Sequence, residues 1–536
     1  MHRRVALTLV VACAFAASPD AQQSPRLVVI VVADQFRADY LTTFAPHWRG
    51  GLATLLGDGA VFRRASYPYR NTDTCPGHFT IGTGTLPRTH GMIANTWWDS
   101  DSRRTIECTD DDKATPMTYG RASKLGKSPR RLLVPTLADE LRGQRPGARV
   151  VTLSLKARSA IGLAGHDGDA VTWFEETPGV GSFMTSTAFS PVPVPAVAAF
   201  LDRNPFEEEF GQLWTLRDPA DRYRFPDAGV GERPRNPRLG LFPHATKGAT
   251  DNRDQAFALW RESPFSDAYL GRMAIALIDA FDLGQRDATD FLGVGFSAGD
   301  TVGHGFGPES REVEDTMARL DDTLGALIAH LDARVGRSNY VLGFSADHGV
   351  APIPLTRGAG RVAGEDVREH IEAVLTGQLG QAETRWVVAG GGQPTLAESA
   401  RTALRGRPAV LQDIEQAVMS IPGVERLLGT DLLSETSRDP VIRAAALSHV
   451  PGRSGDFVVI TKPNWIMTTR NGADGTQHAT FHDYDRHVPV ILFGAGIRPG
   501  RHDRAVTPAD LAPTLASVAG IALPKAEGRV LREALR

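Results

Sequence analysis

The sequence has little cysteine, no marked excess of charge of either sign and no apolar run long enough to span a bilayer. Only three of its 536 residues are cysteines: Cys13 near the start, then Cys75 and Cys108, which either pair or stay as two buried thiols. The 59 basic and 62 acidic side chains give a formal charge of −3, so nucleic acid is not expected as a main partner. No repeat of about 20–50 residues occurs, which argues against a solenoid or propeller.

The first residues have the pattern of an export signal. A basic start is followed by an apolar stretch at residues 5–17, which is too short for a stable transmembrane helix. We place the signal peptide at residues 1–21, with cleavage after Ala16 or Ala17 as alternatives. A periplasmic or secreted protein is therefore expected, and anchoring as a lipoprotein at Cys13 is the minor alternative.

Three apolar runs in the remaining chain lead to acidic or imidazole side chains. Residues 27–33 precede Asp34, residues 291–296 lead to Asp300 and His304, and residues 340–344 lead to Asp347 and His348. Continuous apolar runs are typical of strands in a sheet that is buried on both faces. The pattern predicts an α/β fold with a largely parallel central sheet flanked by helices, and functional side chains at the carboxyl ends of its strands.

Residues 311–335 have the clearest helical periodicity and join Asp300 to Asp347 in one β-α-β unit. We expect one catalytic domain over residues 22–536, interrupted by insertions at about 174–264 and 352–454. The first insertion is rich in proline and has little helical periodicity. It is either a lid over the carboxyl edge of the sheet or a structurally inert excursion.

Thr74 is followed by Cys75 and Pro76, and a hydroxyl residue shortly before proline is typical of a helix start. This predicts Thr74 at the N-cap, where unpaired backbone N–H groups and the helix dipole favour an anion such as phosphate. An ordinary capping threonine is the alternative.

Three aspartates and three histidines are enough for two sites of three ligands each, which suits borderline divalent metals such as zinc. They are Asp34, Asp300, Asp347, His304, His348 and His478. Taken singly, an aspartate after a strand is commonly a helix cap, and Asp-His-Gly is commonly a turn. His482 is the alternative to His478 as a ligand.

The order and spacing of these motifs resemble the alkaline phosphatase superfamily, and within it the bacterial branch with a threonine nucleophile, the PafA type. The resemblance runs from about Arg26 to the C-terminus and is weaker in the insertions. Its carriers are Asp34, Thr74-Cys75-Pro76-Gly77-His78, Asn95, Lys156-Ala157-Arg158, Asp300 with His304, Asp347-His348-Gly349 and His478.

The resemblance implies two zinc or similar ions and a phosphothreonine intermediate on Thr74. One ion would be held by Asp34, Asp347, His348 and the Thr74 oxygen, and the other by Asp300, His304 and His478. Two such ions about 4 Å apart clamp the attacking and leaving oxygens of an in-line displacement.

The resemblance also assigns Asn95, Lys156 and Arg158 to the oxygens of the phosphate, which implies small-molecule phosphate monoesters as substrates. If the strand before Lys156 continues, Lys156 and Arg158 point the same way, because side chains alternate along a strand. The family often has an acidic residue between these two cations, and Ala157 departs from that pattern.

Two other functions stay open. A phosphodiesterase or nucleotide pyrophosphatase of the same superfamily is the main alternative, and a metal-binding or phosphate-binding relative without catalysis is the other. A sulfatase is disfavoured, because Cys75 lacks the x-Pro-x-Arg sequence that should follow a sulfatase nucleophile. The sequence does not indicate an oligomeric state.

Overall fold

The computed structural model describes residues 24–124, 126–175, 181–236, 238–245, 252–357 and 360–536. The predicted signal peptide at residues 1–21 lies outside these ranges. No helix in the described part of the chain combines the length and the apolar character that crossing a membrane requires.

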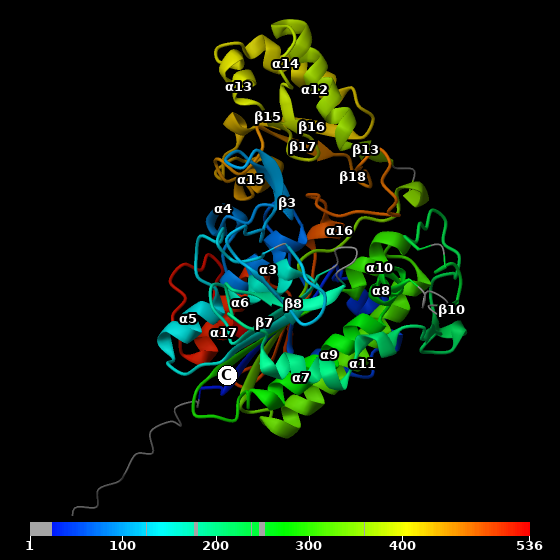
Figure 1. The fold of residues 1–536 in the computed structure, drawn as a ribbon, viewed down its shortest axis with the longest axis vertical. Coiled ribbons are helices and arrows are strands. Elements are labelled where there is room, and N and C mark those ends of the chain that lie inside the picture. The colour runs from blue at the N-terminus through cyan, green and yellow to red at the C-terminus, as the bar shows by residue number, and fades with distance from the viewer. Residues whose placement is uncertain (1–23, 125, 176–180, 237, 246–251, 358–359) are drawn as a thin grey trace, which may run out of the picture.

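A ten-stranded sheet forms the centre of the main body (Figure 1). Its strands, in spatial order, are β20 (Gly500–His502), β2 (Ala60–Phe62), β19 (Val490–Gly494), β12 (Tyr340–Ser345), β1 (Leu27–Ala33), β11 (Asp290–Phe296), β6 (Val150–Ser154), β7 (Ala170–Glu175), β8 (Ser182–Ser186) and β5 (Pro116–Thr118). The central run from β12 through β1, β11 and β6 to β7 is parallel, and β19 and β8 join it antiparallel on either side. The predicted α/β fold with a largely parallel sheet is confirmed.

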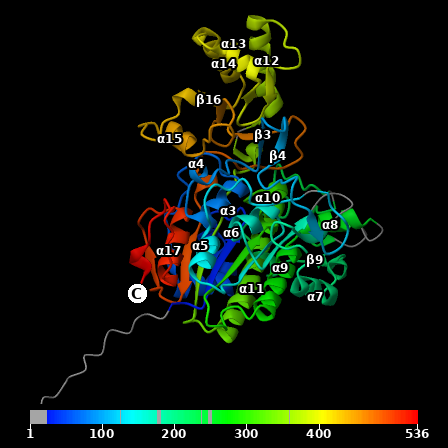
Figure 2. The same cartoon turned by 60° about the vertical axis from the view of Figure 1, so that its left-hand side comes forward.

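Helices cover both faces of this sheet, as Figure 2 shows. One face carries α3 (Thr74–Thr83), α5 (Leu137–Gln144), α6 (Ala157–Ala164) and α17 (Leu511–Ala519), and the other carries α2 (Gly51–Asp58), α7 (Pro195–Arg203), α8 (Arg253–Arg261), α9 (Phe265–Ala280), α10 (Ala298–Phe306) and α11 (Arg311–Arg334). Alternate residues of β1 enter the two cores, with Val29 and Val31 on one side and Val28 and Ile30 on the other. Burial on both faces explains why β1 is apolar at every position.

The remaining short elements lie at the edges of the body. They are α1 (Tyr40–Thr43), α4 (Pro87–His90), α16 (Asp483–Arg486), the hairpin of β3 (Thr96–Asp99) and β4 (Arg104–Glu107), and the pair β9 (Leu213–Trp214) and β10 (His244–Ala245). The first predicted insertion, residues 174–264, is more regular than expected. It begins in β7, supplies β8 to the main sheet and contains α7 and α8.

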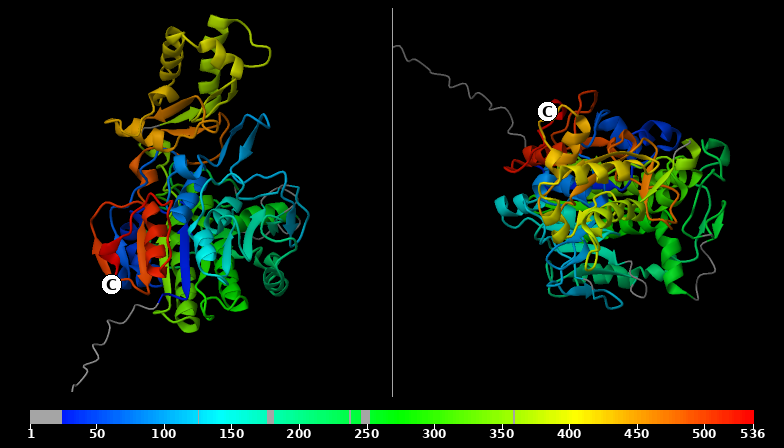
Figure 3. Two further views of the ribbon diagram at one scale, coloured as in Figure 1. Left: turned by 90° about the vertical axis from the view of Figure 1, so that its left-hand side faces the viewer. Right: turned by 90° about the horizontal axis from the view of Figure 1, so that it is seen from above.

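The second predicted insertion forms a subdomain that stands on the main body (Figure 3). Its elements are β13 (Arg361–Ala363), α12 (Gly364–Leu379), β14 (Val387–Ala389), β15 (Thr395–Leu396), α13 (Glu398–Leu404), α14 (Pro408–Met419), β16 (Val424–Gly429), α15 (Pro440–Leu447), β17 (Phe457–Thr461) and β18 (Ile466–Thr468). It has its own apolar core, which includes Val367, Ile371, Ile414 and Val459. Because β17 pairs with β16 and β18 with β13, the subdomain runs past the predicted end at residue 454.

Candidate active site

Four adjacent parallel strands bring the predicted side chains to one edge of the sheet. Asp347 and His348 follow β12, Asp34 follows β1, Asp300 lies in the first turn of α10 after β11, and Lys156 follows β6. The backbone N–H of Asp34 still bonds the carbonyl of Phe296 at 2.9 Å, so the β1–β11 ladder extends to the site. The site therefore occupies the carboxyl edge that the strand pattern predicts.

Thr74 opens α3 but is not its cap. Asp73 is the N-cap residue, with extended backbone angles of φ −102° and ψ 162°, and Thr74 is the first helical residue, so the helix begins one residue earlier than predicted. Gly77 allows α3 to approach the turn after β12, because a Cβ there would lie 2.3 Å from the carbonyl oxygen of Asp347. The Thr74 hydroxyl consequently lies 3.4 Å from Nε2 of His348.

Three histidines are oriented in the same way. Nδ1 of His304, His348 and His478 lies 3.0, 2.8 and 2.9 Å from the backbone carbonyls of Thr476, Gly349 and Thr72, respectively. A carbonyl can only accept, so each Nδ1 carries the hydrogen and each Nε2 keeps a lone pair. This second hydrogen bond is the one that metal-binding histidines usually make.

The ligand atoms form two overlapping triplets, Asp34 with Asp347 and His348, and Asp300 with His348 and His478. Within each triplet all three atoms lie within 4.8 Å of one another. The first triplet is the predicted set. The second contains His348 where His304 was predicted, although Nε2 of His304 lies 3.2 Å from Oδ1 of Asp300. All six predicted ligands thus meet at one place, but His348 is shared between the two triplets.

The chemistry of this donor set fits divalent cations. Among the described residues, Oδ1 of Asp34 and Oδ2 of Asp347 are buried without a hydrogen-bond partner. Burial and the charges of Asp300 and Asp347 raise the pKa of Asp34 well above its ordinary value. Burial and the neighbouring imidazoles lower the pKa of His478 and keep it neutral, which is the form that binds a metal.

Lys156 and Arg158 do not continue β6 as an extended segment, so the predicted alternation is wrong at this point. Lys156 is the N-cap of α6, and Arg158 lies in the first turn of that helix. Nζ of Lys156 donates to Oδ2 of Asp34 at 2.6 Å and to Oδ2 of Asp300 at 2.5 Å. The pKa of Lys156 is raised, because Asp300 and Asp34 outweigh burial and the opposing charge of Arg158. The two cations are therefore close in space, despite the change in backbone.

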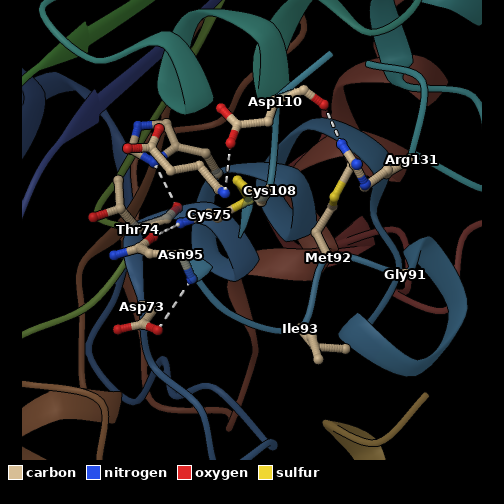
Figure 4. The surroundings of a disulfide bond; sticks show 12 residues. Asp73, Thr74, Cys75, Gly91, Met92, Ile93, Asn95, Cys108, Asp110 and Arg131 are labelled. Carbon is tan, nitrogen blue, oxygen red and sulfur yellow. Dashed lines mark hydrogen bonds between the residues drawn. A yellow bond between two sulfur atoms is a disulfide. The ribbon is translucent and has the colours of Figure 1, made fainter. Parts of the chain in front are cut away.

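Asn95 is held beside Thr74 by the backbone (Figure 4). Its Oδ1 accepts from the N–H of Cys75 at 2.8 Å, which fixes the orientation of the amide. No group in the described part of the chain accepts a hydrogen bond from its Nδ2, which remains available as a donor. Cys75 and Cys108 form a disulfide, one of the two states that the sequence left open, and Cys108 N–H bonds the Asn95 carbonyl at 3.0 Å.

Three further residues support the site and were not assigned roles from the sequence. Gln35 donates from its backbone to Asp347 at 3.1 Å and from Nε2 to Asp300 at 2.8 Å, and it adopts a left-handed φ of 64°. His78 lies 3.1 Å from Asp347, and Asp267 accepts from the first N–H groups of α10. In the sequence, only the position of Gln35 directly after Asp34 could have indicated its role. Neither periodicity nor charge distinguishes a side chain that orients a metal ligand.

His482 lies apart from the triplets, with Nε2 2.9 Å from the carbonyl of Thr461.

The model of the family "Type I phosphodiesterase / nucleotide pyrophosphatase" matches residues 28–485. The chain is 31% identical to alkaline phosphatase PafA of Elizabethkingia meningoseptica, covering 95% of this chain and 94% of the relative. It is 30% identical to alkaline phosphatase PhoV of Synechococcus elongatus, covering 97% and 94%. A crystal structure of wild-type PafA superposes with a TM-score of 0.87 at 29% identity, over 96% of this chain and 100% of that one.

Proposed function

The chain belongs to the type I phosphodiesterase / nucleotide pyrophosphatase family as an alkaline phosphatase-like phosphoesterase of the PafA and PhoV type, and we propose that it hydrolyses phosphate monoesters through a phosphothreonine at Thr74. The observation that carries the proposal is the position of the Thr74 hydroxyl. It lies at the start of α3, 3.4 Å from Nε2 of His348, which belongs to both ligand triplets.

In this proposal Thr74 Oγ attacks phosphorus, and the bond to the leaving alcohol breaks on the opposite side. Water then attacks the phosphothreonine, so that phosphate leaves and the threonine hydroxyl is restored. The positive end of the α3 dipole and the Nδ2 of Asn95 stabilise the phosphate oxygens. Two divalent ions held by the triplets, zinc in this proposal, would lower the pKa of the hydroxyl and neutralise the charge on the leaving oxygen.

The cations beside the site support a preference for monoesters. Lys156 and Arg158 place two positive charges next to the carboxylates. A monoester dianion has more charge on its free oxygens than a diester monoanion, and it therefore gains more from these cations. Hydrolysis of diesters or nucleotide pyrophosphates is the second candidate, and the description of the matching family model favours it.

The proposal includes the cellular setting. Residues 1–21 would direct export, and residues 22–536 would act as one catalytic domain in the periplasm or outside the cell. Fractionation of the producing cells tests this, because activity confined to the cytoplasm contradicts it.

The function itself is tested with initial rates on phenyl phosphate and on the matched diester methyl phenyl phosphate. Thr74→Ala should abolish turnover and Thr74→Ser should keep part of it, because serine retains the hydroxyl. Thr402→Ala, an exposed threonine on α13, is the matched control and should behave as wild type.

Rapid quenching with labelled phenyl phosphate should trap phosphate on Thr74. Wild-type turnover by Thr74→Ala would remove the threonine from the reaction. Faster cleavage of the diester than of the monoester would make the phosphodiesterase function correct.

A further inference from the structure

Beside the metal-ligand cluster, the two insertions bring together arginines that the proposed reaction does not use. Arg233 and Arg235 come from the first insertion, and Arg361 opens β13 of the subdomain. Figure 1 shows β13 and β18 at the base of the subdomain, above α10. This arginine cluster, as we name Arg233, Arg235 and Arg361, is therefore assembled from segments far apart in the sequence.

The cluster is fixed directly against the helix that carries Asp300 and His304. The N–H of Arg233 bonds the carbonyl of Gly305 at 2.8 Å. Gly305 has no side chain to separate the two segments, since a Cβ there would lie 3.2 Å from Cα of Pro234. The first insertion thus lies on α10 one residue beyond His304.

Arg361 reaches the same place from the other side. Its Nη2 donates to the carbonyl of Gly475 at 2.7 Å, and the N–H of Gly475 bonds the carbonyl of His304 at 2.7 Å. Nη1 of Arg361 is buried without a hydrogen-bond partner among the described residues. Gly475 lies directly against Gly305, because a Cβ there would be 2.4 Å from the Gly305 carbonyl oxygen, so Arg361 and the backbone of Arg233 bond neighbouring groups. Burial and the charge of Arg233 lower the pKa of Arg361.

Arg235 lies two residues after Arg233 and pairs with Asp474, the residue before Gly475. Although burial opposes it, the hydrogen bond and charge of Asp474 raise the pKa of Arg235. The Arg235 side chain remains 35% exposed, so a ligand in solvent can reach it.

The acids around the cluster do not balance its charge. Asp474 bonds Arg235 at 2.7 Å and also accepts from Gln477, the residue before His478. Within the described chain, Asp474 is the one carboxylate that forms an ion pair with any of the three arginines. The charges of Arg233 and Arg361 are thus not paired with a carboxylate there, a balance that favours an anion.

We propose that the arginine cluster is a subsite for a second phosphate group, carried by the leaving alcohol of the substrate. The inference rests on the proposed function and extends it, because it places a bisphosphorylated small molecule among the preferred substrates. The leaving group departs on the side of the reaction opposite Thr74, and the second phosphate would stay bound to Arg235 and Arg361 during that step. Guanidinium groups bind phosphate through paired N–H donors, which explains the use of arginine.

The test compares propyl phosphate with propane-1,3-diol bisphosphate, which differ only in the second phosphate. The wild-type enzyme should have a kcat/KM about tenfold or more higher for the bisphosphate. The combined change Arg235→Gln with Arg361→Gln should remove this preference and alter kcat/KM for propyl phosphate less than about threefold. The preference should also weaken with added salt, since salt screens exposed charges.

Two control sets separate charge at this place from charge in general. Arg272→Gln with Arg334→Gln removes two arginines that pair with Glu209 and Asp279 elsewhere on the surface, and it should keep the preference. Arg235→Lys should keep part of it, because the charge remains while the paired donors are lost. If the double glutamine variant is unstable, Arg233→Gln replaces it, because only the backbone of Arg233 bonds Gly305.

Pyrophosphate and inorganic phosphate, used as inhibitors of propyl phosphate hydrolysis, give a binding readout. Pyrophosphate should inhibit the wild-type enzyme more strongly than phosphate does, and the difference should vanish in the double variant. Equal losses on both substrates, or no preference in the wild-type enzyme, would overturn the subsite. Absence of propyl phosphate hydrolysis by the wild-type enzyme would instead overturn the proposed function.

Discussion

At the scale of single residues, the site is built from side chains that each hold one hydrogen bond to the backbone. Each histidine gives its Nδ1 hydrogen to a carbonyl, and Asn95 uses its Oδ1 to accept from Cys75. Each side chain therefore offers only its remaining polar atom to the ligand. This fixed orientation reduces the reorganisation that binding and reaction require.

Asn95→Ala should lower kcat/KM for monoesters by a factor that corresponds to about 2–3 kcal/mol of transition-state stabilisation, the usual range for one lost oxyanion donor. Because the amide also accepts from Cys75, Asn95→Asp serves as a control that keeps this acceptor but loses the donor. Steady-state kinetics should show a loss in both variants, and the larger one in Asn95→Asp, because its second carboxylate oxygen repels the phosphate. Unchanged kinetics in Asn95→Ala would mean that the residue only shapes the turn.

Lys156→Ala with Arg158→Ala should lower kcat/KM for phenyl phosphate far more than for methyl phenyl phosphate. The physical reason is the larger charge on the free oxygens of the monoester, which two cations stabilise more strongly. Lys156 also donates to Asp34 and to Asp300, which are proposed metal ligands, so metal content must be measured alongside the rates. Equal losses on both esters, with metal retained, would assign the pair to general binding.

At the scale of elements, α3 is joined covalently to the end of the β3–β4 hairpin, next to the nucleophile. The disulfide links Cys75, the residue after Thr74, to Cys108, which follows β4. The hydrogen bonds of Cys75 and Cys108 to Asn95 reinforce the same junction. The bond thus ties the helix of the nucleophile to the base of the hairpin, where Asn95 and Cys108 lie on the two paired strands' adjoining ends.

Cys75→Ser with Cys108→Ser should lower the free energy of unfolding by about 3–4 kcal/mol, as expected for a loop closed over 33 residues. Activity should fall as well, mainly through kcat, because Thr74 and Asn95 lose their common anchor. Urea unfolding and steady-state kinetics measure the two effects. A stability loss with unchanged kcat would limit the bond to a structural role.

Sequence alone predicted the elements whose pattern is long and regular. The helix at 311–335 is α11, and its N-cap residue, Ser310, accepts from the N–H of Val313. Prediction failed where a single residue decides whether the backbone continues as a strand or begins a helix. Lys156 was expected to extend β6, but α6 starts directly after it, and close packing of α6 against α3 at Gly82 and Gly162 lies outside any local pattern.

The six ligands could be proposed from sequence because they follow strands or share a resemblance to a known family. The sharing of His348 between the two sets could not, since it depends on the direction of its side chain. Gln35 and Asp267 were missed for a related reason, because both act by orienting other groups. Contacts of this kind connect residues far apart in the chain and leave no periodic signal.

At the scale of the whole molecule, buried ion pairs tie the first insertion to the main body. His47 lies between Asp218 of that insertion at 2.8 Å and Glu314 of α11 at 2.9 Å. Although burial opposes it, these two carboxylates raise the pKa of His47. The stabilisation is therefore complete below the ordinary histidine pKa of about 6.5 and is lost as the pH rises through the raised value.

His47→Gln should consequently cost more stability at pH 6 than at pH 9. Urea unfolding of both proteins at each pH gives the difference, and the loss of packing, which does not depend on pH, cancels in the comparison. An equal cost at both pH values would show that the imidazole is neutral in the folded protein.

The charge of three buried carboxylates connects the site to the stability of the whole fold. Asp34, Asp300 and Asp347 come from separate parts of the chain, and Lys156 is the only lysine or arginine of the described chain that bonds any of them.

Metal ions that bind only the folded protein would stabilise it by about 2.7 kcal/mol for each ion at a free concentration one hundred times its Kd. Exhaustive chelation should therefore lower both the unfolding midpoint and the activity, and zinc should restore both. Elemental analysis should find two ions per wild-type chain and one in Asp300→Ala or His478→Ala. Full activity after chelation, with no metal detected, would contradict the assignment of this cluster.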